Sequence, residues 1–215
     1  MKQIKKIIST VLVSASLMSF AQVNFGVKAN LLYRSDSPSW TSIKNGSTTV
    51  YNDKGKNSAG YNFGVSAKID TPLGIFVQPE LYYTTFKNEY TIANTTIEAK
   101  NNRVDLPVLV GYNVLGKMLG IYAGPVASYN LSTDNQWNDF KENATKNFTV
   151  GYQFGAQATI SKLVLTARYE GAFSKDQREF IDNNTNTTVK YDSRPSLLIL
   201  ELDTISRIFF KISKE

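Results

Sequence analysis

The sequence predicts an all-β protein, an eight-stranded antiparallel up-and-down transmembrane β-barrel with short periplasmic turns and long extracellular loops. Three observations predict this fold. Segments of about ten residues, the length of a tilted membrane strand, alternate apolar and polar side chains; the polar face is small and mostly uncharged; short and long connections alternate along the chain. Because successive side chains of a strand point to opposite faces, this period of two places one face in an apolar medium and the other in a polar one.

The chain begins with a segment typical of a cleaved signal peptide, residues 1–21. A cluster of lysines precedes an apolar run over residues 7–20, and Ser19-Phe20-Ala21 is a small-x-small site after which we expect cleavage. The lysines are Lys2, Lys5 and Lys6. The alternative, a membrane anchor, is disfavoured because the apolar run is shorter than the roughly 20 residues of a spanning helix.

Composition excludes several functions for the mature chain, residues 22–215. The sequence has no cysteine and no histidine, so thiol chemistry, the commonest general base and the commonest zinc ligand are missing. We therefore predict no enzyme activity, no catalytic residue, no cofactor and no metal site. Cleavage of the signal segment removes three lysines and reduces the formal net charge from +6 to +3. The sequence also has no cluster of Lys and Arg interleaved with aromatic residues. We therefore expect no nucleic-acid partner.

The alternating segments predict the strands in chain order. They are residues 23–33, 58–69, 75–86, 102–113, 118–131, 148–160, 163–173 and 196–210. Short connections with turn residues follow the second, fourth and sixth segments. They are residues 70–74, 114–117 and 161–162. Long connections rich in Asn, Thr, Ser, Asp and Lys follow the other segments, and they are residues 34–57, 87–101, 132–147 and 174–195. Up-and-down connectivity collects each class at its own end of the barrel.

The composition of the polar face decides which face points outward. A soluble barrel has the same period with an apolar inside, but its surface usually carries dense Lys and Glu. Residues 149–159 instead present Thr, Gly and Gln on their polar face, which suits a narrow interior. Aromatic residues lie near the predicted strand ends, as in the headgroup region of a membrane. They are Tyr33, Tyr61, Tyr83, Tyr129, Phe148 and Phe173 toward the loops, with Phe25 and Tyr112 toward the turns.

Charged residues on the polar face near mid-strand form the candidate site. They lie on four of the predicted strands, and by the alternation all point inward. The cluster consists of Lys28, Glu80, Arg103, Asp105, Arg168 and Glu170. Because unpaired buried charge is costly, we interpret this cluster as a set of ion pairs that closes a narrow lumen. The alternatives are a polar lining that selects a solute or proton path and a catalytic carboxylate pair.

Three prolines depart from this pattern. Pro79, Pro107 and Pro125 fall inside predicted strands, where each removes a ladder hydrogen bond. A closed barrel has no edge to hold them, so we expect β-bulges at these positions.

The last segment is harder to align with the others. Residues 197–202 are apolar except for Glu201, which leaves the phase of the last strand open. Phe209 and Phe210 supply an aromatic end of the kind that barrel-assembly machinery reads during biogenesis, but residues 211–215 follow them.

Four segments together cover much of the predicted barrel and share a pattern. They are Val23-Asn24-Phe25-Gly26-Val27-Lys28-Ala29, Gln78-Pro79-Glu80-Leu81-Tyr82-Tyr83, Val104-Asp105-Leu106-Pro107-Val108-Leu109-Val110-Gly111-Tyr112 and Gly120-Ile121-Tyr122-Ala123-Gly124-Pro125. In these segments the chain resembles the small outer-membrane β-barrel family labelled porin-like or PorT-like. The resemblance implies an eight-stranded barrel, and the family has no agreed catalytic residues that could be assigned to this sequence. One branch of the family is linked to protein secretion.

Several functions remain open at this level. The first is a structural or surface-binding protein with a largely plugged, charged lumen, whose long loops contact a surface ligand or protein, with Trp40 and Trp137 as candidate anchors. The second is a narrow porin-like channel for ions or small solutes. The third is an accessory role in secretion across the outer membrane, and an enzyme acting on lipid or peptide has the weakest support. Outer-membrane lipid is the partner that all of them share.

Overall fold

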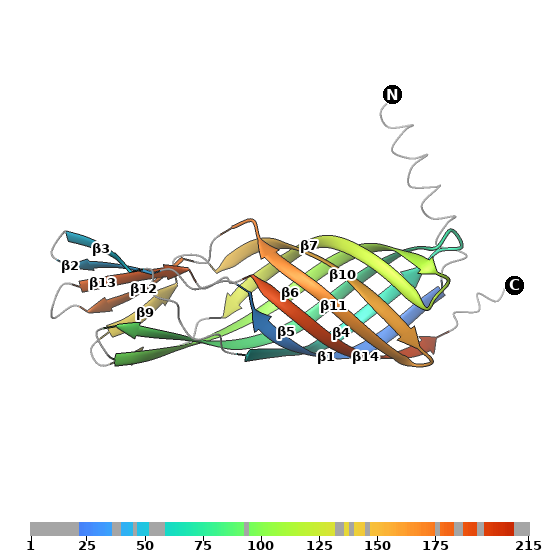
Figure 1. Cartoon of the computed structure of the whole chain (residues 1–215), viewed down its shortest axis with the longest axis horizontal. Coiled ribbons are helices and arrows are strands. Elements are labelled where there is room, and N and C mark those ends of the chain that lie inside the picture. Colours follow the sequence, from blue (N-terminus) through green and yellow to red (C-terminus); the bar gives the residue numbers. More distant parts are fainter. Residues whose placement is uncertain are drawn as a thin grey trace, which may run out of the picture.

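The computed structural model describes fourteen β-strands, which form a closed barrel and a second sheet at one end of it (Figure 1). The described residues are 22–35, 40–44, 47–51, 59–92, 95–131, 136–137, 140–144, 147–174, 177–182, 187–192 and 196–208. Side chains are described for residues 23–35, 59–87, 100–131, 147–174 and 196–204. The expected signal peptide, residues 1–21, lies outside these ranges. Within them, no helix is long and apolar enough to cross a membrane.

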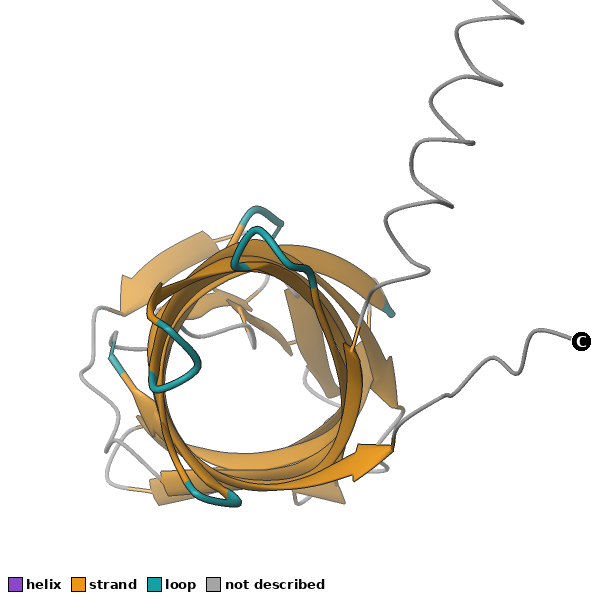
Figure 2. Ribbon diagram, turned by 90° about the vertical axis from the view of Figure 1, so that its right-hand side faces the viewer, coloured by secondary structure: helices purple, strands orange, loops and turns teal. Residues whose placement is uncertain are grey.

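Eight antiparallel strands close the barrel, as the alternation predicts. They are β1 (Gln22–Arg34), β4 (Ala59–Asp70), β5 (Ile75–Ile92), β6 (Thr95–Leu115), β7 (Leu119–Leu131), β10 (Phe148–Ile160), β11 (Leu163–Ala172) and β14 (Leu197–Ile208). Around the barrel their order is β1-β14-β11-β10-β7-β6-β5-β4. The first strand pairs with both β4 and β14, so the C-terminal strand closes the sheet. Figure 2 shows the resulting ring from the end that carries the short turns.

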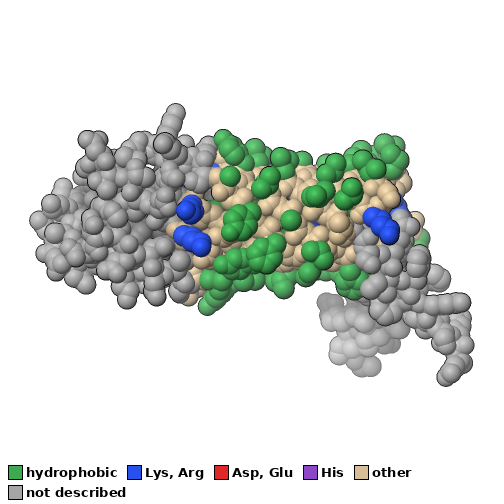
Figure 3. All heavy atoms as spheres, turned by 90° about the horizontal axis from the view of Figure 1, so that it is seen from below, with side chains coloured by type: hydrophobic (Ala, Val, Ile, Leu, Met, Phe, Trp, Pro, Cys, Tyr) green, Lys and Arg blue, Asp and Glu red, His purple; other side chains and the backbone are tan. Residues whose placement is uncertain are grey.

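Apolar side chains face outward and polar side chains face the lumen. On β1, Val27 is 67% exposed and the neighbouring Lys28 is 1% exposed, and the same alternation runs along β4, β7 and β11. In the space-filling view, hydrophobic side chains cover the barrel wall, and Lys and Arg appear only toward its two ends (Figure 3). This confirms a transmembrane barrel and excludes the soluble alternative, because a soluble barrel would expose its polar face.

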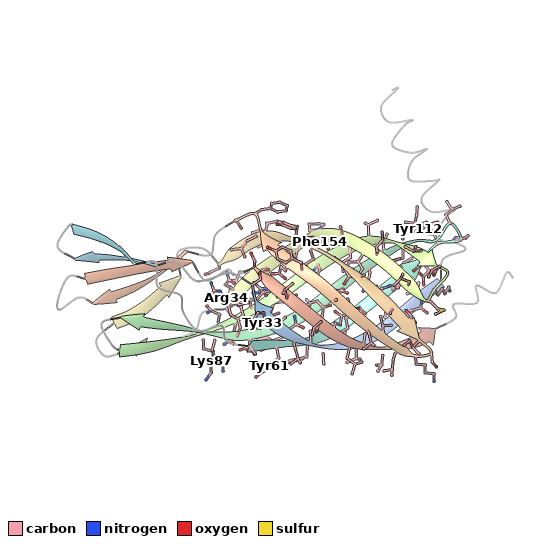
Figure 4. The ribbon with its side chains drawn as sticks, in the orientation of Figure 1. Tyr33, Arg34, Tyr61, Lys87, Tyr112 and Phe154 are labelled. Carbon is pink, nitrogen blue, oxygen red and sulfur yellow. The ribbon has the colours of Figure 1, made fainter. Side chains whose placement is uncertain are left out.

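Aromatic side chains on this wall lie near both ends of the strands. Tyr33 and Tyr61 mark the loop end and Tyr112 marks the turn end, and each is more than half exposed (Figure 4). Tyr83 is less exposed because its ring packs against that of Phe63, with centroids 5.5 Å apart. Such rings at two levels suit the two headgroup regions of a bilayer.

The phase of the last strand is settled by its neighbours. Leu32 of β1 pairs with Ile199 of β14, and both side chains point into the lumen with Leu197. Leu198 and Leu200 face outward, while Glu201 faces inward. The apolar run was ambiguous in the sequence because leucine and isoleucine occupy both faces here.

The three prolines do not lie at bulges, so this expectation was wrong. The ladder between β4 and β5 is interrupted beside Pro79, between the pairs Ser66↔Glu80 and Ile69↔Val77, and it resumes in the same register. The β5–β6 ladder is interrupted in the same way beside Pro107, and the β6–β7 ladder beside Pro125. A proline removes a donor without inserting a residue, so it opens a gap in the ladder and leaves the register unchanged.

The long connections contain strands of their own, which polar composition did not reveal. They are β2 (Trp40–Lys44), β3 (Ser47–Tyr51), β8 (Gln136–Trp137), β9 (Phe140–Ala144), β12 (Gln177–Asp182) and β13 (Thr187–Asp192). These strands form a six-stranded sheet in the order β3-β2-β13-β12-β9-β8 at the loop end of the barrel (Figure 1). In addition, β5 and β6 stay paired from the barrel out to Ile92↔Thr95, so most of the expected loop 87–101 is a hairpin. Threonine and aromatic residues in these segments favour strands although the segments are polar.

The three short turns follow β4, β6 and β10, as expected. Gly74 and Gly116 have φ values of 80° and 53°, a left-handed conformation that glycine adopts without strain. Ser161 takes a φ of 60° in the tightest turn, of which Lys162 is the second residue.

Inward-facing glycines make room for large side chains on neighbouring strands. Gly155 of β10 pairs with Arg168 of β11, and a Cβ added to this glycine would lie 2.8 Å from the Arg168 Cβ. Gly64 of β4 pairs with Tyr82, and a Cβ there would lie 2.7 Å from the tyrosine Cδ1. At both positions the backbone of the neighbouring strand also comes close, because the added Cβ would collide with the carbonyl oxygens of Ala167 and Leu81.

We expect Gly155→Val to destabilise the barrel by about 2 kcal/mol, because the new side chain collides with the backbone carbonyl oxygen of Ala167 and with Arg168. The measurement is a urea titration of the lipid-reconstituted protein, with the folded fraction read from heat-modifiable migration on a gel. The matched control is Ala156→Val, which adds a similar side chain to the exposed face of the same strand. Equal stability of the two variants would contradict the steric argument.

Candidate functional site

The structure places all six residues of the predicted cluster inside the barrel. Lys28 comes from β1, Glu80 from β5, and Arg168 from β11, and each is no more than 3% exposed. Arg103 and Asp105 of β6 and Glu170 of β11 are buried to the same degree. The alternation of each strand explains this placement, because the six positions share the lumen-facing parity of their strands.

One group of ion pairs crosses the lumen near the middle of the barrel. Glu80 lies between two cations: its Oε1 is 2.8 Å from Lys28 Nζ, and its Oε2 is 2.7 Å from Arg168 Nη1. Glu201 of β14 also pairs with both Lys28 and Arg168. These four side chains connect β1, β5, β11 and β14, so the ion pairs join strands from opposite sides of the barrel.

Neighbouring side chains complete the surroundings of Glu80 and Arg168. Gln78 Nε2 donates to Glu80 Oε1 at 2.6 Å, and the Tyr82 hydroxyl donates to Glu80 Oε2. Arg168 Nη2 donates to the Tyr82 hydroxyl at 3.1 Å. The guanidinium carbon of Arg168 also lies 5.6 Å from the ring centre of Tyr122, within the range of a cation–π contact.

A second group of ion pairs lies nearer the loop end. Arg103 Nε is 2.9 Å from Asp105 Oδ2, and Arg103 Nη2 is 2.7 Å from Glu170 Oε1. Thr84 donates its hydroxyl to Asp105 Oδ2 at 2.6 Å. The Phe86 ring faces the Arg103 guanidinium at 5.6 Å.

Gln153 of β10 links the two groups into one network. Its Oε1 accepts a hydrogen bond from Arg168 Nη1 at 2.9 Å, and its Nε2 donates to Glu170 Oε2 at 2.7 Å. The six predicted side chains are thereby connected without a break across the lumen.

Sequence reasoning missed two carboxylates of this network and the amide that links its two groups. Glu201 interrupts the apolar run of the last strand, and a carboxylate at that depth is expected to avoid lipid, which was a usable signal. Asp203 lies two residues on, on the same face, with its Oδ2 3.5 Å from Lys28 Nζ. Gln153 carries no charge, and nothing in the sequence separates it from Gln157, the other glutamine of its strand.

The network contains more carboxylates than cations, and each carboxylate is paired with a cation of the chain. Three cations, Lys28, Arg103 and Arg168, face five carboxylates. The carboxylates are Glu80, Asp105, Glu170, Glu201 and Asp203. Among the described residues, no group of three or more carboxylates is arranged to hold a metal ion. Each carboxylate here accepts from a cation of the chain itself, so the arrangement fills and holds the lumen.

The lumen near the loop end has a different character. Several buried polar side chains there carry an atom without a hydrogen-bond partner among the described residues. They are Asn30, Asn62, Ser128 and Asn130. Buried polar groups of this kind are ordinarily satisfied by water, so this part of the lumen is suited to hold water.

We expect Arg168→Met to destabilise the folded barrel by about 3 to 5 kcal/mol, because it leaves Glu80 and Glu201 buried with Lys28 as their remaining cation. The free energy of unfolding is measured by urea titration in lipid vesicles. Lys87→Met, at an exposed position near the loop end, is the control and should change stability by less than about 0.5 kcal/mol. A loss below about 1 kcal/mol for Arg168→Met would mean that these pairs contribute little to stability.

Comparison with known proteins identifies the family. Residues 18–175 match the family model described as outer membrane protein beta-barrel domain, which is more than half of the chain. Among curated proteins, none matches this sequence.

Solved structures share the architecture at low sequence identity. The outer membrane protein OprG from Pseudomonas aeruginosa matches with a TM-score of 0.62 and 12% identity, covering 86% of this chain and 96% of that one. Neisserial surface protein A matches with a TM-score of 0.44 and 12% identity, covering 84% of this chain and 96% of that one. At such identity, the likeness to OprG concerns the fold alone. The family match and the closed, lipid-facing barrel agree, and we conclude that this chain is an integral outer-membrane protein belonging to the outer membrane protein beta-barrel domain family.

Proposed function

We propose that this protein is a non-enzymatic scaffold of the outer membrane, with a lumen closed by ion pairs and a loop-end sheet that contacts a surface ligand or another protein. The observation that carries the first half is the buried network. Lys28, Glu80 and Arg168 are no more than 3% exposed and span the lumen from several strands. An eight-stranded barrel is just wide enough for side chains to fill it, so such a network leaves no open path.

The loop-end sheet supports the second half of the proposal. Its six strands come from three separate connections, and β5 and β6 extend out of the barrel beside them (Figure 1). Binding residues commonly lie on loops held by a rigid scaffold, and a structured extension holds its surface in a more constant shape than independent loops would. The sheet ends at β3, whose backbone pairs with β2 on one side among the described strands. An edge of this kind offers a row of donors and acceptors to a partner chain.

A narrow channel is the second candidate, favoured by one observation. The polar side chains near the loop end, including Asn30, Asn62 and Asn130, have atoms without hydrogen-bond partners among the described residues and are suited to hold water. Water in that part would reach the Arg103 group of the network. The scaffold and the channel then differ in one respect. In a channel, the ion-pair network would open and connect this water to the turn end of the barrel, whereas in the scaffold it stays closed.

We expect the wild-type protein to give no long-lived single-channel steps in planar lipid bilayers, because the network closes the lumen. Removing three of its side chains together, by Glu80→Ala, Arg168→Ala and Glu201→Ala, should produce such steps. Leu200→Ala on the lipid-facing side of β14 is the control, with no steps expected. Large, stable steps from the wild-type protein would instead support the channel.

We expect a photoreactive residue placed at Thr49 of β3 to crosslink to one ligand or protein in intact cells, because this edge strand lies at the loop end. The same residue placed at Val65, on the lipid-facing wall, is the control and should reach lipid only. The surface-binding proposal fails if the two positions give the same products.

A further inference from the structure

A basic cavity of about 230 Å³ opens at the turn end of the barrel, away from the central network. It is lined by residues from β1, β4 and β10 and from the turns after β6 and β10. They are Asn24, Lys68, Asp70, Lys117, Thr159, Ser161 and Lys162. Three lysines thus face one carboxylate, with an amide and two hydroxyls among them. This lining suits a small anion rich in oxygen acceptors.

The bottom of the cavity is fixed in place by its own contacts. Asp70 accepts hydrogen bonds from Asn24 Nδ2 at 3.0 Å and from Asn113 Nδ2 at 3.2 Å. Lys68 Nζ lies 3.7 Å from Asp70 Oδ1 and 4.0 Å from the centre of the Phe76 ring. The single carboxylate is therefore paired with Lys68. Two further lysines of the lining, Lys117 and Lys162, are both exposed in their turns.

An apolar groove on the outer wall adjoins this cavity. The groove, of about 490 Å³, is lined by Phe25, Val27 and Val65, and these side chains are 43%, 67% and 52% exposed. Lys162 lines both the groove and the cavity. This lysine therefore lies at the rim of the barrel, between a polar, positively charged hollow and a wall that faces lipid tails.

We propose that this rim binds an anionic phospholipid of the periplasmic leaflet. The phosphate group lies against Lys162 and Lys117 at the cavity, and an acyl chain follows the groove past Phe25 and Val27. Charge complementarity assigns the headgroup, because ammonium groups bind phosphate as point charges. The apolar groove indicates that the ligand also carries an acyl chain, because a soluble phosphate has no apolar part to bury there. Short turns face the periplasm in outer-membrane barrels, which places the site in the inner of the two leaflets.

The test measures retention of phosphatidylglycerol and of phosphatidylcholine by the full mature chain in a neutral detergent, using native mass spectrometry. We expect the wild-type protein to retain phosphatidylglycerol in preference to phosphatidylcholine. The double variant Lys117→Gln/Lys162→Gln should bind phosphatidylglycerol about thirtyfold more weakly. This figure follows because each lysine near an anionic lipid contributes about 1 kcal/mol of binding free energy. Both substitutions lie in exposed turns, and heat-modifiable migration checks that the barrel still folds.

Lys87→Gln/Lys100→Gln is the matched control, since it removes the same charge from two exposed lysines that pair across β5 and β6 near the loop end. This control should retain phosphatidylglycerol like the wild type. An equal loss in the control, or full retention by the turn-end variant, would overturn the proposal. Glycerol phosphate, which has the headgroup chemistry without acyl chains, should bind far more weakly than phosphatidylglycerol. Equal binding would identify the ligand as a soluble phosphate and overturn the assignment to a lipid.

Discussion

The structure depends on one constraint: in a bilayer, nearly every backbone amide and carbonyl of the barrel must pair within the protein. Antiparallel strands meet this constraint only when the last strand pairs with the first, as β14 does with β1 from Val23↔Ile208 to Arg34↔Leu197. Closing the ring with eight strands fixes a narrow interior. A large inward side chain is accommodated more easily where the neighbouring inward position is small. Gly155 beside Arg168 and Gly64 beside Tyr82 are the consequence of this limit.

The same limit explains why the lumen holds ion pairs. Taking charges out of water costs more than an isolated pair returns, so buried pairs persist where several partners satisfy each group. Glu80 has four such partners, because Lys28, Arg168, Gln78 and Tyr82 all contact its carboxylate. Losing any one cation leaves carboxylates facing one another in a space without room for much water. The network therefore favours one arrangement of the strands around it, whatever its net contribution to stability.

The sequence predicts what depends on local period and misses what depends on pairing between distant segments. Residues 148–160 were placed correctly as a strand, and Lys28, Glu80 and Arg168 were placed on the inner face, because parity alone decides these features. The phase of β14 escaped prediction because Leu197 and Ile199 are as apolar inside as Leu198 and Leu200 are outside. The loop-end sheet escaped for a different reason. Its central pairs, β2 with β13 and β12 with β9, join connections that are far apart in the chain.

The prolines show how the network and the backbone compensate one another. Ladders are interrupted between β4 and β5, β5 and β6, and β6 and β7, while the ladders between β10, β11, β14, β1 and β4 continue without a gap. One side of the barrel is therefore held by fewer backbone hydrogen bonds than the other. Glu80 lies on the weaker side, in the interrupted stretch beside Pro107, and its carboxylate pairs with Lys28 of β1 and Arg168 of β11 on the continuous side. The ion pairs thus tie the interrupted half of the barrel to the half whose ladders are complete. We infer that the buried charges help to specify which strands face one another across the lumen, because ion pairs are directional in a way that apolar contacts are not.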